Sequence, residues 1–294
     1  MSIVCEGLTH TYMANSPFQA TAIHGVHLTV GDGDFLGIIG HTGSGKTTLV
    51  MHMNALLKPT AGRVLIDGKD INEKDFDRRE VRRRVGLVFQ YPEHQLFEET
   101  VAKDIAFGPK NLGLSDVETS ERVREALLRV GLPPAEMEGR SPFDLSGGQM
   151  RRVAIAGVLA MRPGTLILDE PAAGLDPAGR RELLSLVQRL HAEGVTVVMV
   201  SHSMEDVALL ATRIAVMNQG SLFLCGSPRE IFRQGEALLA MGLDVPTAVR
   251  LADALRARGF LIPAEIYQMP ALRDWLIERF GQAGPPAVSE EAPR

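Results

Sequence analysis

A glycine-rich loop with one lysine and three threonines carries the clearest chemistry in the chain, and it suits a nucleoside triphosphate. The loop follows the apolar run Phe35–Ile39 and has the pattern G-x-x-x-x-G-K-[ST]. Glycines let the backbone approach a ligand closely, and the first amides of the following helix favour negative charge. Lys46 would reach the β- and γ-phosphates, and Thr47 would offer its hydroxyl to Mg²⁺. The predicted nucleotide-binding residues of this loop are Gly40, His41, Thr42, Gly43, Ser44, Gly45, Lys46, Thr47 and Thr48.

An acidic pair, Asp169 and Glu170, follows a second apolar run at the end of a predicted strand. Successive side chains on a strand point to opposite sides. Asp169 is therefore expected to face the Mg²⁺ beside Thr47, and Glu170 to face a different point, where an attacking water would lie. Hydrolysis needs such a residue because phosphoryl transfer otherwise depends on positioning and charge neutralisation. The alternative is an acidic strand end that only caps a loop.

A second glycine-rich sequence, Leu145-Ser-Gly-Gly-Gln149, precedes a helical pattern. Ser146 is a plausible N-cap, and Gly147 and Gly148 would expose amides at the helix N-terminus. Two anion sites for one triphosphate make sense if two subunits pair head to tail, so that each nucleotide lies between one phosphate loop and the other chain's Ser146–Gln149. Taken alone, the sequence is also typical of an ordinary loop before a helix.

Composition narrows the possible roles. The chain has 294 residues, a formal net charge of -5 and two cysteines. The acidic balance argues against nonspecific nucleic-acid binding as the main role. Cys5 and Cys225 fit no metal-ligand spacing, which favours a reduced cytosolic compartment. No apolar run approaches the roughly 18 residues that span a membrane, and the N-terminus lacks a signal-peptide pattern. Any membrane role is therefore expected to be peripheral.

The elements that must position these residues alternate between short β-branched runs and longer amphipathic stretches, which predicts a parallel sheet with helices on its faces. The segment Ile3–Val30 alternates polar and apolar residues instead, which suits an antiparallel sheet. A helical insertion is expected over about residues 92–160. A hairpin around Asn218–Gly220 precedes a helical extension over 227–280, with one helix near Val249–Leu255 and another near Leu272–Phe280. Residues 281–294 are predicted to be disordered. The buried strands are expected at Phe35–Ile39, Val85–Phe89, Thr165–Leu168 and Thr196–Val200.

In this order the motifs resemble the ATPase subunits of ATP-binding cassette (ABC) transporters, over roughly residues 1–230. The resemblance implies a P-loop NTPase core with a parallel sheet, an N-terminal antiparallel β subdomain and a helical insertion, with residues 1–226 as the ATPase domain. It implies ATP and Mg²⁺ as cofactors. Tyr12 would stack on adenine, although an aromatic at a strand end is more often packing. Gln90 would join the Mg²⁺ site, Asp176 would cross the dimer interface, and His202 would reach the γ-phosphate. The implied catalytic residues are Glu170, His202 and Gln90, and the implied Mg²⁺ ligands are Thr47, Gln90 and Asp169.

Finer matches resemble the energy-coupling factor branch of this family, and most closely the second of its two paired A-type ATPases. They lie at Phe89–Phe97, Asp104–Pro109, Ser141–Ala156 and Ser203–Asp206. Transporters of this branch take up vitamins and transition-metal ions. The resemblance implies a heterodimer with a related A-type ATPase, although a homodimer is possible. It also implies a transmembrane T-type subunit, a substrate-binding membrane S-type subunit, and a place on the cytoplasmic face of the cell membrane. One departure is Ala172, where the branch usually has threonine.

Two further features have competing interpretations. In this branch a C-terminal region helps to hold the two ATPases together, so Trp275 and Phe280 are candidates for that contact or for a small intramolecular core. The basic run Arg78–Arg84 also contains Glu80, which favours a solvated helix face over a nucleic-acid site.

Three other classes of protein share the motifs. DNA-organising or repair ATPases carry a long coiled coil between them, but only about a hundred positions separate Lys46 from Leu145. Translation-associated ATPases usually hold two cassettes in one chain, and this chain has one. The third class is an ATPase subunit of another ABC importer or exporter. Only the finer matches to the energy-coupling factor branch argue against this interpretation.

Overall fold

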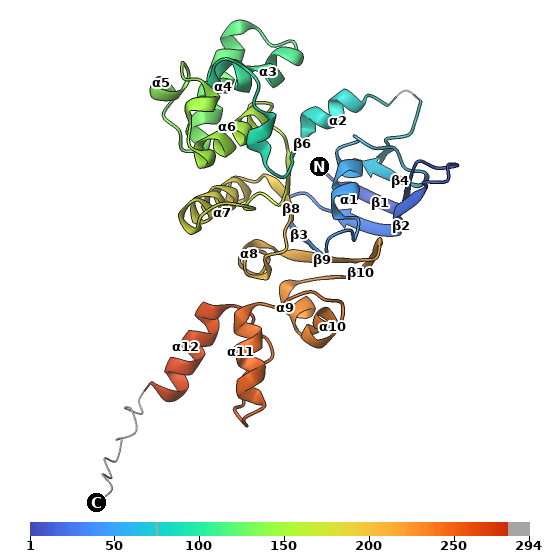
Figure 1. Ribbon diagram of the computed structural model, residues 1–294, viewed down its shortest axis with the longest axis vertical. Coiled ribbons are helices and arrows are strands. Elements are labelled where there is room, and N and C mark those ends of the chain that lie inside the picture. The colour runs from blue at the N-terminus through green and yellow to red at the C-terminus, as the bar shows by residue number, and fades with distance from the viewer. Residues whose placement is uncertain (75, 282–294) are drawn as a thin grey trace, which may run out of the picture.

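The computed structural model describes residues 1–74 and 76–281. Two sheets lie between a group of helices at one end and the C-terminal helices at the other (Figure 1). Of the tail predicted to be disordered, residues 282–294 lie outside the described residues. No helix in the described part of the chain is long and apolar enough to cross a membrane.

The central sheet has six strands in the order β10-β9-β3-β8-β7-β6. All neighbouring pairs are parallel except β9 with β10, which form the predicted hairpin. The four predicted buried strands are confirmed, with small shifts at the ends of β6 and β7. The strands are β3 (Phe35–Ile39), β6 (Val85–Val88), β7 (Thr165–Asp169), β8 (Thr196–Val200), β9 (Arg213–Asn218) and β10 (Ser221–Gly226).

The antiparallel sheet predicted at the N-terminus is present, with four strands in the order β2-β1-β4-β5. Its two long strands pair along most of their length, and Ile3 lies opposite Val30. The strands are β1 (Ile3–Tyr12), β2 (Ala20–Val30), β4 (Ala61–Ile66) and β5 (Lys69–Asp70).

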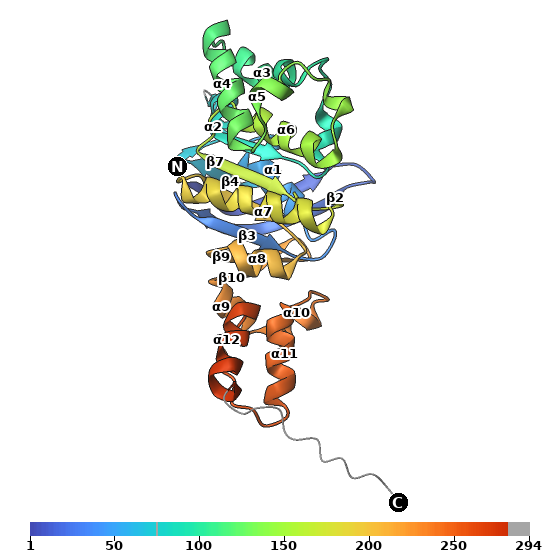
Figure 2. The ribbon, with the colours of Figure 1, turned by 90° about the vertical axis from the view of Figure 1, so that its left-hand side faces the viewer.

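Side-chain alternation divides the central sheet between two cores. On β3, Phe35 and Ile39 pack into one core, whereas Leu36 and Ile38 pack into the other. The second core lies beneath the antiparallel sheet and α1 (Lys46–Met53). The first core lies beneath α7 (Pro177–Ala192) and α8 (Met204–Leu210), and α7 crosses the sheet in Figure 2. Burial on both faces explains why the strands are continuously apolar.

The predicted helical insertion joins β6 to β7 and packs into the first core. Its long helices begin at side-chain caps, among them the capping box formed by Ser115 and Glu118. The segments from α2 to α6 are α2 (Arg78–Arg84), the short 3-10 helix η1 (Pro92–Gln95), α3 (Val101–Asn111), α4 (Asp116–Arg129), α5 (Pro134–Met137), the 3-10 helix η2 (Pro142–Asp144) and α6 (Gly147–Leu159).

The C-terminal extension contains the two predicted helices and two shorter ones. Buried side chains of α9 and α10 share the first core, so the division of the chain at residue 226 stays a prediction. A small separate core forms around Ala252 and Leu272, where Leu251 is exposed, Trp275 packs at the margin and Phe280 is 42% exposed. The helices are α9 (Pro228–Phe232), α10 (Gly235–Ala240), α11 (Thr247–Arg256) and α12 (Met269–Phe280).

Candidate functional site

The phosphate loop turns sharply between β3 and α1. Gly45, which caps α1, has a φ of 95°, and a Cβ atom there would lie 2.5 Å from Cγ2 of Ile23. Glycine is therefore required both for the backbone angle and for the close approach. The Lys46 ammonium donates to the carbonyl oxygens of Gly40, at 2.6 Å, and His41, at 2.9 Å. The loop therefore wraps around its own lysine.

The electrostatics of Lys46 suit a phosphate ligand. Its side chain is buried, and this burial lowers the pKa of the ammonium, while the charges of Glu170 and Asp169 act in the opposite direction. Ser44 is buried beside it, and its hydroxyl has no hydrogen-bond partner among the described residues. A buried cation and a buried hydroxyl at the N-terminus of α1 fit a phosphate group.

Two of the three candidate Mg²⁺ ligands, Thr47 and Asp169, are in direct contact. The Thr47 hydroxyl donates to Oδ2 of Asp169 at 2.7 Å. Asp169 ends β7 and is buried; burial raises its pKa, and the Thr47 hydrogen bond and the charge of Lys46 oppose this rise. A hydroxyl and a carboxylate are oxygen ligands, and Mg²⁺ commonly binds through one or two carboxylates together with substrate phosphates. The residues present therefore fit Mg²⁺, with the Gln90 side-chain oxygen as a further candidate.

Three candidate catalytic residues meet at one carboxylate. Nε2 of His202 lies 2.6 Å from Oε2 of Glu170, and Nε2 of Gln90 lies 3.4 Å from the same oxygen. Gln90 follows β6, Glu170 follows β7 and His202 follows β8. The carboxyl ends of these neighbouring parallel strands form one edge of the sheet, which is where ligands of open α/β sheets bind.

Backbone geometry aims the Glu170 side chain. Its φ is 50°, which is uncommon for a residue with a side chain, and its amide donates to the carbonyl of Val200. This conformation turns the chain directly after Asp169. The two carboxylates of the acidic pair are therefore directed to different partners, Thr47 and His202.

The segment Ser146–Gln149 does not join the phosphate loop within this chain. Ser146 caps α6, its hydroxyl accepts from the Gln149 amide, and the Gln149 side chain accepts from the Ser146 amide. Both Ser146 and Gly147 are exposed, with Gly148 beside them at the same helix start. No hydrogen bond within residues 1–74 and 76–281 connects this segment to Gly40–Thr48.

Two more candidates occupy the expected elements. The Tyr12 hydroxyl lies 3.2 Å from the Thr48 hydroxyl, and the Tyr12 ring packs edge-on against His10 and is 40% exposed. The Tyr12 side chain therefore lies beside α1 and is partly exposed to solvent. Asp176 caps α7 by accepting from the Gly179 amide at 2.7 Å.

One buried residue near the site was not singled out from the sequence. Arg151 on α6 contacts Glu93, Pro171 and Ala173. The available signal was its helical spacing, because Arg151 lies four and eight positions before Ile155 and Leu159, which are both buried.

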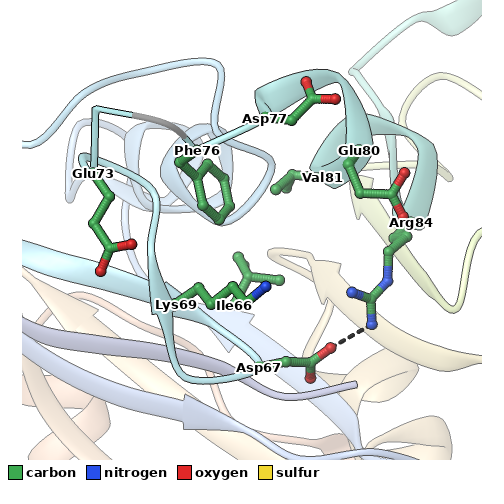
Figure 3. Close-up of a pocket in the computed structure, with 9 residues that line it drawn as sticks. All are labelled: Ile66, Asp67, Lys69, Glu73, Phe76, Asp77, Glu80, Val81 and Arg84. Atoms are coloured by element: carbon green, nitrogen blue, oxygen red, sulfur yellow. Dashed lines mark hydrogen bonds and ion pairs between the residues drawn. The ribbon is translucent and has the colours of Figure 1, made fainter.

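A separate pocket lies between β4, β5 and α2 (Figure 3). Its lining includes Asp67 and Arg84, which form an ion pair. Arg84 directly precedes β6, whereas Gln90 lies beyond its other end. The pocket is therefore at the opposite edge of the sheet and contains none of the candidate residues.

Known proteins resemble this chain along nearly its whole length. The profile described as "ABC transporter" matches residues 23–173. The energy-coupling factor transporter ATP-binding protein EcfA2 of Symbiobacterium thermophilum is 56% identical over 289 residues, which cover 97% of this chain and 100% of that protein. The EcfA2 of Clostridium tetani is 52% identical over 95% of this chain and 98% of its own length.

Solved structures agree with this assignment. CbiO1 from Clostridium perfringens, described as part of the ABC transporter complex cbiONQ, is 36% identical, with a TM-score of 0.72 over 85% of this chain and 98% of that chain. The ATP-binding cassette MJ0796, solved as a dimer after hydrolysis with ADP and phosphate bound, is 29% identical, with a TM-score of 0.68 over 77% of this chain and 99% of that chain. The chain therefore belongs to the ABC transporter family and, within it, to the ATP-binding proteins of energy-coupling factor transporters.

Proposed function

We propose that this chain hydrolyses ATP at a site completed by a second ATPase subunit, and that hydrolysis drives import through membrane subunits of an energy-coupling factor transporter. The observation that carries the proposal is the convergence of Gln90, Glu170 and His202 beside the Thr47–Asp169 pair. This is the arrangement that hydrolysis of a γ-phosphate requires, since a water, a metal and the phosphate must be held together.

Each residue of the site has a distinct role in this proposal. Lys46 and the loop amides bind the phosphates, and Tyr12 stacks on the adenine. Thr47, Asp169 and Gln90 hold Mg²⁺, which when bound neutralises charge on the phosphate oxygens. Glu170 orients and deprotonates the attacking water, and His202 stabilises charge on the γ-phosphate.

The separation of Ser146 from the phosphate loop supports a composite site. Ser146, Gly147 and Gly148 present a capped helix N-terminus to solvent, which is suited to an anion. In a head-to-tail pair, this segment contacts the γ-phosphate held by the other subunit, and Asp176 lies at the interface. A related A-type ATPase is the proposed partner.

A groove between α2 and the helical insertion is the proposed docking site for the membrane T-type subunit. It lies between α2, η1, α3 and α6 and includes Phe97 and Phe107. The two exposed rings pack edge to face, with their centroids 5.1 Å apart. The η1 segment connects this groove to Gln90. A movement of Gln90 on binding or loss of the γ-phosphate would therefore be transmitted to the membrane subunit through η1. Docking there would hold the chain on the cytoplasmic face of the membrane, with vitamins or transition-metal ions as cargo chosen by an S-type subunit.

Isolation of the intact complex in detergent tests this proposal. The chain is expected to co-purify with a second ATPase and at least one membrane-spanning protein, and its ATP hydrolysis should depend on Glu170. Purification without any membrane protein, or hydrolysis that survives Glu170→Gln, would contradict the proposal.

A further inference from the structure

Arg151 is a buried arginine on the helix that starts at Ser146. It is only 3% exposed, and it lies on the same face of α6 as Ile155 and Leu159. An arginine is rarely buried to this extent unless its charge is paired and its donors are used. The partners of Arg151 therefore indicate why an ion occupies this apolar face.

Four hydrogen bonds use four of the five N–H donors of the guanidinium. Nε and Nη2 donate to the two carboxylate oxygens of Glu93 at 2.9 and 2.7 Å, in a bidentate pair. Nη1 donates to the carbonyl oxygens of Pro171, at 2.9 Å, and Ala173, at 2.8 Å. Glu93 lies three residues beyond Gln90, and Pro171 directly follows Glu170. One side chain thus joins the segments that carry two candidate catalytic residues.

Both segments contain a residue in the left-handed region next to these contacts. Glu170 has a φ of 50°, and Tyr91, the neighbour of Gln90, has a φ of 54°. Such conformations persist only where the surroundings fix them. The Ala173 amide donates to the Glu170 carbonyl, and Arg151 holds the Ala173 carbonyl. On the other side, the Tyr91 ring centroid lies 5.9 Å from Cζ of Arg151.

The turn after Glu170 is held in place through its backbone carbonyl groups rather than through its side chains. Residues 171–174 are proline, two alanines and glycine, so no polar side chain within the turn can anchor it. Arg151 donates to the carbonyl oxygens of the residues on both sides of Ala172. The guanidinium is planar and forked, which lets it reach both carbonyls and the carboxylate at once, whereas a lysine ammonium cannot.

We propose that Arg151 is a positioning residue that holds Gln90 and Glu170 in register with each other and with the helix that begins at Ser146. The inference rests on the proposed ATPase function and extends it. Arg151 acts through Glu93 and the turn after Glu170, and its hydrogen bonds involve no residue of the phosphate loop. Its loss should therefore slow hydrolysis while ATP binding remains.

Steady-state hydrolysis and ATP binding by Arg151→Lys and Glu93→Gln test this role, in the complex with the partner ATPase. A misplacement of about 1 Å can cost roughly 100-fold in rate, so we expect kcat to fall at least about tenfold while KM and nucleotide affinity change by less than about threefold. The double variant should be no slower than the worse single variant. The exposed pair Arg162 and Glu125 provides the matched controls Arg162→Lys and Glu125→Gln, which should retain wild-type kcat.

A paired substitution separates positioning from stability. Glu93→Met combined with Arg151→Met removes both buried charges and should recover much of the Tm lost in Arg151→Met, while kcat stays low. Recovery of kcat together with Tm, or a wild-type kcat in Arg151→Lys, would overturn the inference. Glu170→Gln is measured alongside: if it also hydrolyses at the wild-type rate, the proposed function fails, and if it does not, only the role of Arg151 fails.

Discussion

Nε2 of His202 lies 2.6 Å from Oε2 of Glu170, although the two residues are on different strand ends. His202 is largely exposed, whereas the Glu170 side chain is mostly buried. The histidine therefore closes over the carboxylate from the solvent side. This relationship makes the Glu170 carboxylate the centre of the site.

Substitution of His202 by alanine should lower kcat with little change in ATP affinity. His202 is proposed to stabilise charge that develops on the γ-phosphate, and removal of one such group typically costs about 10²- to 10³-fold. Comparison of kcat with the affinity for a non-hydrolysable ATP analogue checks this prediction. An unchanged kcat would remove His202 from the catalytic set.

Substitution of Ser146 by arginine should abolish hydrolysis without affecting ATP binding to the same chain. The arginine would obstruct the exposed helix N-terminus, whereas the phosphate loop of that chain makes no hydrogen bond with it among the described residues. Nucleotide binding and turnover are both measured in the complex with the partner ATPase. Normal turnover would contradict a composite site.

Acid should destabilise the fold partly through His52. Its side chain is fully buried on α1, and burial, together with the nearby His10, lowers its pKa from 6.5 to about 4, with a weak opposing contact at the Leu57 backbone. Because the pKa of His52 is lower in the folded than in the unfolded state, protonation favours the unfolded state. The contribution of His52 to the free energy of unfolding is therefore at its full value above about pH 6.5 and falls as the pH drops toward 4. At 1.36 kcal/mol per pKa unit, the loss is about 3 kcal/mol.

Urea unfolding across this pH range checks the role of His52. His52→Leu should lose less free energy of unfolding than the wild type between pH 6.5 and 4. The exposed His27 gives the control His27→Gln, which should follow the wild type. Parallel pH curves for wild type and His52→Leu would contradict the prediction.

Truncation of the aromatic pair in the groove should weaken the membrane partnership. Phe97→Ala with Phe107→Ala removes two exposed rings, so stability and ATP binding should change little, while co-purification of the membrane subunit should fall. Phe223→Ala is a matched control, because Phe223 is 50% exposed on β10 and Phe107 is 49% exposed. Equal recovery of the membrane subunit with all variants would exclude this groove.

The sequence predicted the parts of the fold that depend on local pattern. The bounds of β3 and β8 were predicted correctly, because continuous apolar runs between polar turns are typical of strands covered on both faces. The sequence also predicted that Asp169 faces Thr47, and the two side chains are hydrogen-bonded. The contact between Glu170 and His202 was not predicted; it forms because both residues follow strands that end at the same edge of the sheet. The left-handed conformation of Glu170 could not be predicted, because no glycine marks it.

Long-range packing accounts for the rest of what the sequence did not reveal. Arg151 and its partners Glu93 and Pro171 are 58 and 20 positions apart, and no short motif connects them. Leu251 fits the apolar spacing of α11 but is exposed, because this short helix buries only Ala248, Val249 and Ala252. Which side chains of α11 are buried depends on the elements that pack against the helix, and not only on the spacing of apolar residues in its sequence.

Hydrolysis by Glu170→Gln, measured together with its ATP affinity, tests the central claim most directly. Glutamine keeps the size of the side chain but cannot accept the proton of the attacking water, and loss of a positioned general base costs about 10²- to 10⁴-fold. The account predicts ATP affinity close to that of the wild type, with kcat reduced by at least about 100-fold. Near-normal hydrolysis would contradict it.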